Sequence, residues 1–139
     1  MATRSVVTVF LESEGKILLL HRGSRVGTYT GRWAGVSGSI DPGNTPEQQA
    51  RVEIREETEL RDDDVRFLSA GRPVAFADAE HGWEWIVHPF RVVVLHPANI
   101  RIDWEHTELR WIDPADIASF DTVPKLLEAW QRVSGNAPA

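Results

Sequence analysis

The best-marked element in this sequence is a helix predicted from Pro46 to about Thr58, in a chain whose other segments are mostly predicted as β-strands. Thr45 can cap the start of the helix, the proline that follows suits its first turn, and Gln48 completes a capping box with Thr45. Ala50 and Ile54 lie on one side of the helix and can pack on a sheet. The chain is therefore expected to fold as a sheet with this helix against it.

Runs rich in β-branched and apolar residues lie on both sides of the helix. They predict strands at residues 6–11, 16–21, 65–69, 73–77, 83–87, 90–95 and 108–112, with short extended pieces between 32 and 40. A helical turn is predicted at residues 114–119, and a last helix that opens at Thr122 and Pro124 and ends at Gly135. The order of these elements predicts a mixed sheet in an α/β (α+β) fold.

The length of 139 residues is about that of one domain, and two separate cores would each be too small to be stable. No linker, repeat or low-complexity segment divides the chain, so residues 1–139 are predicted to form a single domain with a frayed tail after residue 135. Hydrophobic residues make up 42% and charged residues 26%, as in ordinary globular proteins.

Composition also limits the location and the partners. The chain has no cysteine, which excludes disulfides and thiolate zinc sites and favours a cytoplasmic location. The apolar run at residues 6–11 is broken at Glu12 and resembles a strand rather than a signal peptide, and no stretch is long enough to span a membrane. A net charge of −6 argues against stable nucleic-acid binding, and an anionic substrate would need a metal ion. The five histidines are scattered, as ordinary surface or core residues would be.

Three glutamates on the predicted helix are the first candidates for chemistry. Taking Glu53 as the origin, Glu57 lies at about +40° and Glu56 at about −60° around the helix, so all three carboxylates share one face. Such a face can hold a divalent cation, but it can equally be a solvated acidic surface, since exposed like charges at this spacing cost only about 0.2 to 0.5 kcal/mol. The spacing alone leaves both readings open.

The surrounding segment, GSIDPGNTPEQQARVEIREETEL from Gly38 to Leu60, resembles the signature of the Nudix hydrolase superfamily, G-x5-E-x7-R-E-U-x-E-E-x-G-U, where U is aliphatic. The residues that match in register are Gly38, Glu53, Ile54, Glu56, Glu57 and Leu60. The resemblance implies a Nudix-like mixed β-sheet sandwiched between helices.

The resemblance also implies an activity and a set of ligands. Glu53, Glu56 and Glu57 would hold Mg²⁺ or Mn²⁺, with the Gly38 carbonyl as a further ligand, and water would attack a phosphorus atom of a nucleoside diphosphate linked to another moiety. The expected partner is thus a small nucleotide-type diphosphate. Family members are often dimers, so a homodimer is an expected assembly.

Three positions depart from the signature and keep other functions open. Asn44 stands where the pattern has its first glutamate, Val52 where it has arginine, and Glu59 where it has glycine. Glu59 falls at an expected left-handed helix end. Asn44 and Val52 suit a Nudix-fold domain that binds or senses a nucleotide with weak or no catalysis. An acidic interaction module with a coincidental motif is a third reading.

Groups outside the helix complete the candidate site. Many members of this family take a further metal ligand or the general base from a loop late in the sheet, which makes Glu105 the first candidate for that catalytic role and Glu108 the second. The cations that could neutralise phosphates are Arg22, Arg25 and Arg32, and the aromatic residues that could stack on a base are Trp33, Trp83, Trp85 and Trp104.

Overall fold

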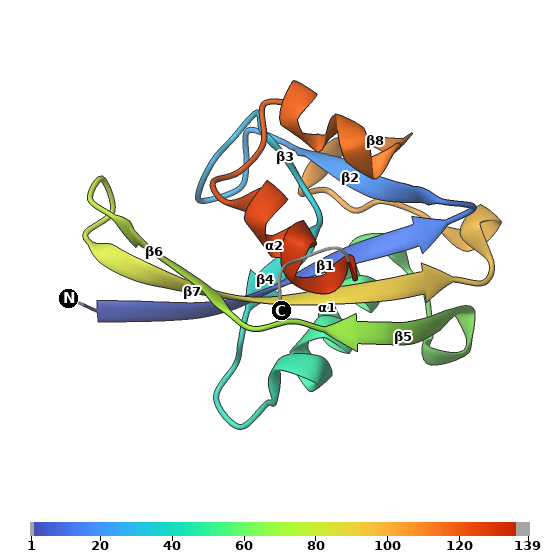
Figure 1. Cartoon of the computed structure of the whole chain (residues 1–139), viewed down its shortest axis with the longest axis horizontal. Coiled ribbons are helices and arrows are strands. Elements are labelled where there is room, and N and C mark those ends of the chain that lie inside the picture. Colours follow the sequence, from blue (N-terminus) through green and yellow to red (C-terminus); the bar gives the residue numbers. More distant parts are fainter. Residues whose placement is uncertain (1, 136–139) are drawn as a thin grey trace.

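The computed structural model of the protein describes residues 2–135, which form one mixed sheet with a helix on each side (Figure 1). The strands are β1 (Ala2–Ser13), β2 (Lys16–Arg22), β3 (Trp33–Ala34), β4 (Val36–Ser39), β5 (Val65–Ala70), β6 (Val74–Asp78), β7 (Trp83–Val94) and β8 (His106–Ile112). The helices are α1 (Pro46–Thr58) and α2 (Leu126–Val133), with 3-10 turns at Asp62–Asp64, Pro97–Asn99 and Pro114–Ser119. The expected α+β fold, with a mixed sheet between helices, is confirmed.

The centre of the sheet is a parallel pair formed by β1 and β7, in register from Ala2↔Trp83 to Glu12↔Val93. On its other edge β1 pairs first with β4 and only at its end with β2, so β2 diverges from β1 and pairs with β8 instead. β6 pairs with the first half of β7 and β5 with the second half. The sheet therefore splits beside β4, where β2 separates from β1, and α1 lies on that side.

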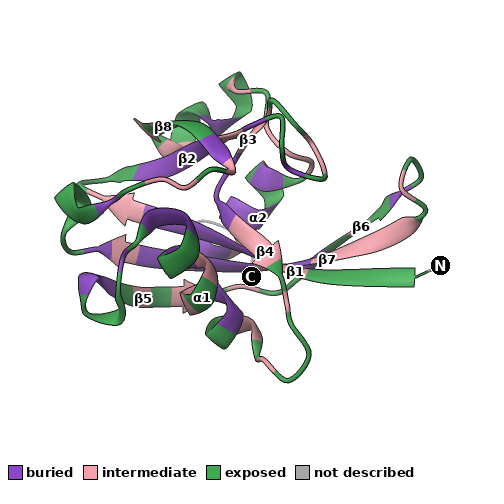
Figure 2. Ribbon diagram, turned by 180° about the vertical axis from the view of Figure 1, so that it is seen from behind, coloured by how far each residue is buried: buried purple, intermediate pink, exposed green. Residues whose placement is uncertain are grey.

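The two faces of the sheet carry separate cores, because successive side chains of a strand point to opposite faces. On β1, Val7, Val9 and Leu11 belong to the core that contains Ala50 and Ile54 of α1. Phe10 belongs to the core under α2, where its ring lies edge-on against Trp130 at 5.3 Å. Figure 2 shows these buried segments at the centre, while the first residues of β1 extend away from them and are exposed.

Helix α1 begins and ends where its local signals predict. The Thr45 hydroxyl accepts a hydrogen bond from the Gln48 backbone N–H, and the Gln48 side chain accepts one from the Thr45 N–H. Glu59 ends the helix in the left-handed region, with φ of 63°, and donates its N–H to the Arg55 carbonyl. The expected left-handed end is thus present without glycine.

Several predicted boundaries differ from the structure, and the first strand, expected at residues 6–11, spans Ala2–Ser13. Residues 83–87 and 90–95 were expected as two strands but form the single strand β7. Pro89 lies between the segment paired with β6 and the segment paired with β5, so its missing N–H interrupts neither antiparallel ladder.

The last helix begins later than expected. α2 starts at Leu126 rather than near Pro124, because Thr122 bridges to Trp33 and the Val123 N–H bonds the Trp33 carbonyl, which keeps that segment extended. The tail after residue 135, expected to be frayed, lies outside the described residues. Within residues 2–135 no helix is long and apolar enough to cross a membrane.

Candidate active site

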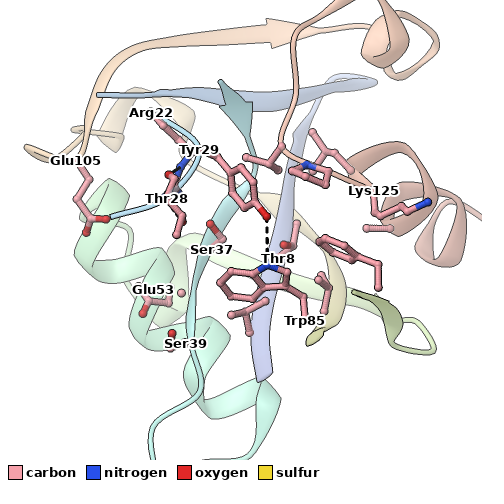
Figure 3. Close-up of a pocket in the computed structure, with 18 of the residues that line it drawn as sticks. Thr8, Arg22, Thr28, Tyr29, Ser37, Ser39, Glu53, Trp85, Glu105 and Lys125 are labelled. Carbon is pink, nitrogen blue, oxygen red and sulfur yellow. Dashed lines mark hydrogen bonds between the residues drawn. The ribbon is translucent and has the colours of Figure 1, made fainter. Parts of the chain in front are cut away.

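A pocket of about 350 Å³ opens on the α2 side of the sheet and reaches past β4 to α1. Figure 3 shows Arg22, Glu53 and Glu105 at one end and Tyr29, Trp85 and Lys125 toward the other. Glu56, on the same helix as Glu53, and Phe76, which pairs opposite Trp85, also line the pocket. A charged end and an aromatic end thus share one cavity, with a volume in the range of small-molecule sites.

The glutamates of α1 are unequally exposed. Glu53 and Glu56 line the pocket, whereas the side chain of Glu57 lies behind them and the residue is only 1% exposed. The helical spacing correctly puts the three on one side, and the alternative of a solvated acidic surface is wrong for Glu57. Ser37 of β4 donates its backbone N–H to Glu57 Oε1 at 3.4 Å, and Glu57 Oε2 has no hydrogen-bond partner among the described residues.

The carboxyl groups of Glu53 and Glu57 lie close enough to affect each other's pKa. Burial raises the pKa of Glu57 well above its usual range, and the neighbouring Glu53 carboxyl raises it further. Burial also raises the pKa of Glu53, while its interactions with the Glu57 carboxyl and then with the Gln49 amide act in the opposite direction. Carboxyl groups held this way in a pocket take up a proton unless a cation replaces it, and such perturbed groups are typical of functional sites.

His106 is a member of the site that the sequence did not single out. It is buried at the start of β8, with Nδ1 2.9 Å from Asp103 Oδ1 and Nε2 3.6 Å from Glu57 Oε1. The second distance is too long for a hydrogen bond, so His106 covers Glu57 without being joined to it. Its place next to Glu105 in the sequence was the available signal.

Arg22 and Glu105 close the charged end of the pocket from the opposite side. The Gly23 N–H donates to the Glu105 carbonyl at 2.8 Å, which holds the two loops together, and the Arg22 guanidinium is fixed by Thr28. Burial raises the pKa of Glu105, and the charge of Asp103 raises it further. Burial lowers the pKa of Arg22, which Glu57 and Glu105 counteract.

Of the remaining candidates from the sequence, some line the pocket and others lie on the surface. Glu108 lies on the surface and pairs with Arg110 at 3.0 Å, and Arg32 lies near Asp121 at 4.0 Å. Of the four tryptophans, Trp85 is the one among the residues that line the pocket, while Trp104 is 65% exposed. The structure therefore brings together Gly38, Glu53, Glu56, Glu57, Glu105, Arg22 and Trp85.

The aromatic end is built around Asp78, a residue that no sequence motif marks. Its Oδ2 accepts hydrogen bonds from the Tyr29 hydroxyl at 2.6 Å and from Trp85 Nε1 at 2.8 Å, and His81 contacts the same carboxylate. Tyr29 has a φ of 50°, an unfavourable conformation for a residue with a side chain, and the bond to Asp78 helps to hold it there. The loop that carries Tyr29 is thus fastened over the pocket.

The hydrogen bond between Tyr29 and Asp78 can be tested by titration because Tyr29 is the only tyrosine in the chain. Burial raises the pKa of Tyr29 to about 12, and the hydrogen bond to Asp78 contributes to the rise. In Asp78→Asn we expect the tyrosine to titrate closer to its ordinary value of about 10, as followed by the ultraviolet absorbance of tyrosinate. An unchanged titration would show that Tyr29 is not bonded to Asp78. Glu80→Gln is the control that keeps the bond.

The residues at the charged end have the chemistry of a divalent metal site. A Cβ added to Gly38 would collide with the Glu53 carboxyl group, so the glycine is what lets this side chain pass β4 into the pocket. The unpartnered Glu57 Oε2 offers a buried acceptor, and carboxylate oxygens are the ligands that Mg²⁺ prefers. Among residues 2–135 no three such groups are already close enough to enclose an ion, so the exposed Glu56 and the half-buried Glu105 would have to turn inward.

Comparison with known proteins identifies relatives that match most of the chain. A family model described as a NUDIX domain matches residues 1–133. The nucleoside triphosphatase NudI of Escherichia coli O81 (strain ED1a) is 26% identical over 132 residues, which cover 87% of this chain and 89% of that protein.

Solved structures agree in fold. The MutT protein from Methanosarcina mazei Go1 has a TM-score of 0.80 and 22% identity, covering 97% of this chain and 95% of that one. The dihydroneopterin triphosphate pyrophosphohydrolase of E. coli has a TM-score of 0.76 and 20% identity, covering 97% and 96%. At these identities the structures demonstrate a common fold.

Proposed function

The chain belongs to the Nudix hydrolase family, and we propose that it cleaves the pyrophosphate bond of a nucleoside diphosphate linked to another group, of which a nucleoside triphosphate is the simplest example. The observation that carries this proposal is the two-ended pocket, with acidic groups and one arginine at one end and aromatic rings at the other. A polyphosphate fits the first end once its charge is neutralised, and a nucleoside fits the second.

At the charged end, Glu53, Glu56 and Glu57 would hold Mg²⁺ or Mn²⁺ together with the Gly38 carbonyl. The ion, when bound, supplies positive charge to the phosphates and lowers the pKa of coordinated water. Arg22 adds a fixed cation on the other side of the pocket, where it can pair with a phosphate oxygen. Glu105 would accept the proton of the attacking water, and its raised pKa supports this role because it makes the carboxylate a better base than an exposed glutamate.

At the aromatic end, the nucleoside would lie against Phe76 and Trp85 beneath Tyr29. Trp85 Nε1 and the Tyr29 hydroxyl both donate to Asp78, so neither hydrogen is available to donate to the edge of a base. Recognition there would depend on stacking and apolar contact. The name of the NudI relative, a nucleoside triphosphatase, agrees with a substrate of this class.

The proposal is tested by incubating the purified protein with nucleoside triphosphates, ADP-ribose, dinucleoside polyphosphates and nucleotide sugars, with Mg²⁺, with Mn²⁺ and with a chelator. We expect cleavage of at least one compound into two phosphorylated products in the presence of metal only. Products formed in isotopically labelled water would identify the phosphorus atom attacked. Tight binding of a nucleotide without any turnover would instead select the sensing domain.

A further inference from the structure

Gln49 is a buried polar residue on α1 that is not one of the candidate metal ligands. It is 1% exposed and lies one turn before Glu53. Its side-chain Nε2 donates a hydrogen bond to Glu53 Oε1 at 3.1 Å. Its Oε1 accepts two hydrogen bonds, from the Asp41 backbone N–H at 3.0 Å and from Asn44 Nδ2 at 2.9 Å.

These contacts fix which way the amide of Gln49 faces. A backbone N–H can only donate, so the atom of Gln49 that faces Asp41 must be the oxygen. The NH₂ group then faces Glu53 and donates a hydrogen bond to its carboxylate. Two partners before the helix therefore determine a hydrogen bond inside the site.

The bond constrains the carboxylate that it reaches. Glu53 Oε1 lies between Gln49 Nε2 and the backbone of Gly38, where an added Cβ would collide with it. Oε2 is the oxygen that Gln49 leaves unengaged. We propose that Gln49 is a positioning residue, which holds Glu53 so that this second oxygen is presented to the metal, and that Asn44 is the anchor that keeps Gln49 in place. This inference rests on the proposed function of the same site.

The same network includes one of the departures from the family signature, and a second departure lies outside it. Asn44, in the place of a glutamate, contacts Gln49 rather than the pocket. Val52, in the place of an arginine, is 37% exposed and contributes no charge, and Arg51 beside it pairs with Glu47 and Asp62 on the outer side of the helix. Uncharged groups thus orient Glu53 without neutralising it, and its charge stays available to a cation.

Gln49→Met tests the role, because methionine has nearly the same shape and cannot donate. Mn²⁺ is titrated into each protein and the bound ion is counted by electron paramagnetic resonance, alongside kcat and KM for the best nucleotide substrate. We expect the Mn²⁺ dissociation constant to rise and kcat to fall by about tenfold or more each, with KM changed by less than about threefold. Asn44→Ala should lie between this variant and wild type.

A stability effect alone would not produce this pattern. Ile117→Val, in the core on the α2 side, is the control for a small loss of folding stability, and it should leave Mn²⁺ affinity unchanged. Equal Mn²⁺ affinity in Gln49→Met and wild type would overturn the positioning role. If wild type binds Mn²⁺ but hydrolyses nothing, the proposed function fails while the affinity ratio still decides the role of Gln49. If wild type binds no Mn²⁺, both fail.

Discussion

Replacing Glu57 with glutamine is expected to lower metal-dependent turnover by about a hundredfold or more, and at the same time to make the metal-free protein more stable at alkaline pH. The loss of activity follows from the removal of a buried carboxylate whose Oε2 has no partner among the described residues. The gain in stability follows from burial, because an uncharged amide at this place avoids the unfavourable ionisation of a buried acid.

The direction of the pH effect follows from the raised pKa. The folded chain keeps Glu57 protonated at pH values where the unfolded chain has already released that proton, so the folded state loses stability as the pH rises through the folded pKa. Urea unfolding of the metal-free proteins at about pH 5 and about pH 8 measures this. Wild type should lose more stability than Glu57→Gln between the two conditions.

Glu56→Gln is the matched control, since it removes a neighbouring carboxylate that is exposed. It should weaken turnover without changing the pH dependence of stability in the way that Glu57→Gln does. Unchanged turnover in Glu57→Gln would remove this residue from the metal site. An unchanged pH dependence would mean that Glu57 is ionised in the metal-free protein, with its charge balanced by another group of the site.

The parts of the fold that the sequence predicts well are those set by neighbouring residues. α1 begins and ends as expected because its proline, its capping box and its last turn all lie within a few positions of one another. The continuity of β7 through Pro89 depends on which strands lie beside it, and the late start of α2 depends on a contact with Trp33. Neither the continuity of β7 nor the start of α2 can be predicted from the residues next to it in the sequence.

The same distinction applies to the site. Helical spacing gives the direction of Glu57 but not what covers it, and the covering groups, Ser37 and His106, come from β4 and β8. The pairing of Tyr29 with Asp78 joins residues far apart in the chain, and no sequence signal links them. Glu105 could be nominated because the family resemblance points to its loop, and the structure adds that it shares the pocket with Glu53.

Glu105→Gln is expected to reduce kcat by about a hundredfold or more while changing KM only slightly, if Glu105 is the base that activates water. The loop position of the side chain should survive, because the Gly23 N–H holds the Glu105 backbone carbonyl rather than its carboxylate. Glutamine then occupies the same place but cannot accept the proton. The nucleotide, which is bound by other groups, should still saturate the enzyme.

The pH dependence separates a base from a passive neighbour. Since burial raises the pKa of Glu105, the acidic limb of kcat in wild type should lie above the ordinary value of about 4.5 for an exposed glutamate, and this limb should be lost in Glu105→Gln. Glu108→Gln is the control on β8, because it removes a surface carboxylate whose pairing with Arg110 contributes only about 0 to 1 kcal/mol. That variant should keep both the rate and the profile of wild type. Equal rates for Glu105→Gln and wild type would move the proton-accepting role to another carboxylate of the pocket, and Glu53 would then be the next to test.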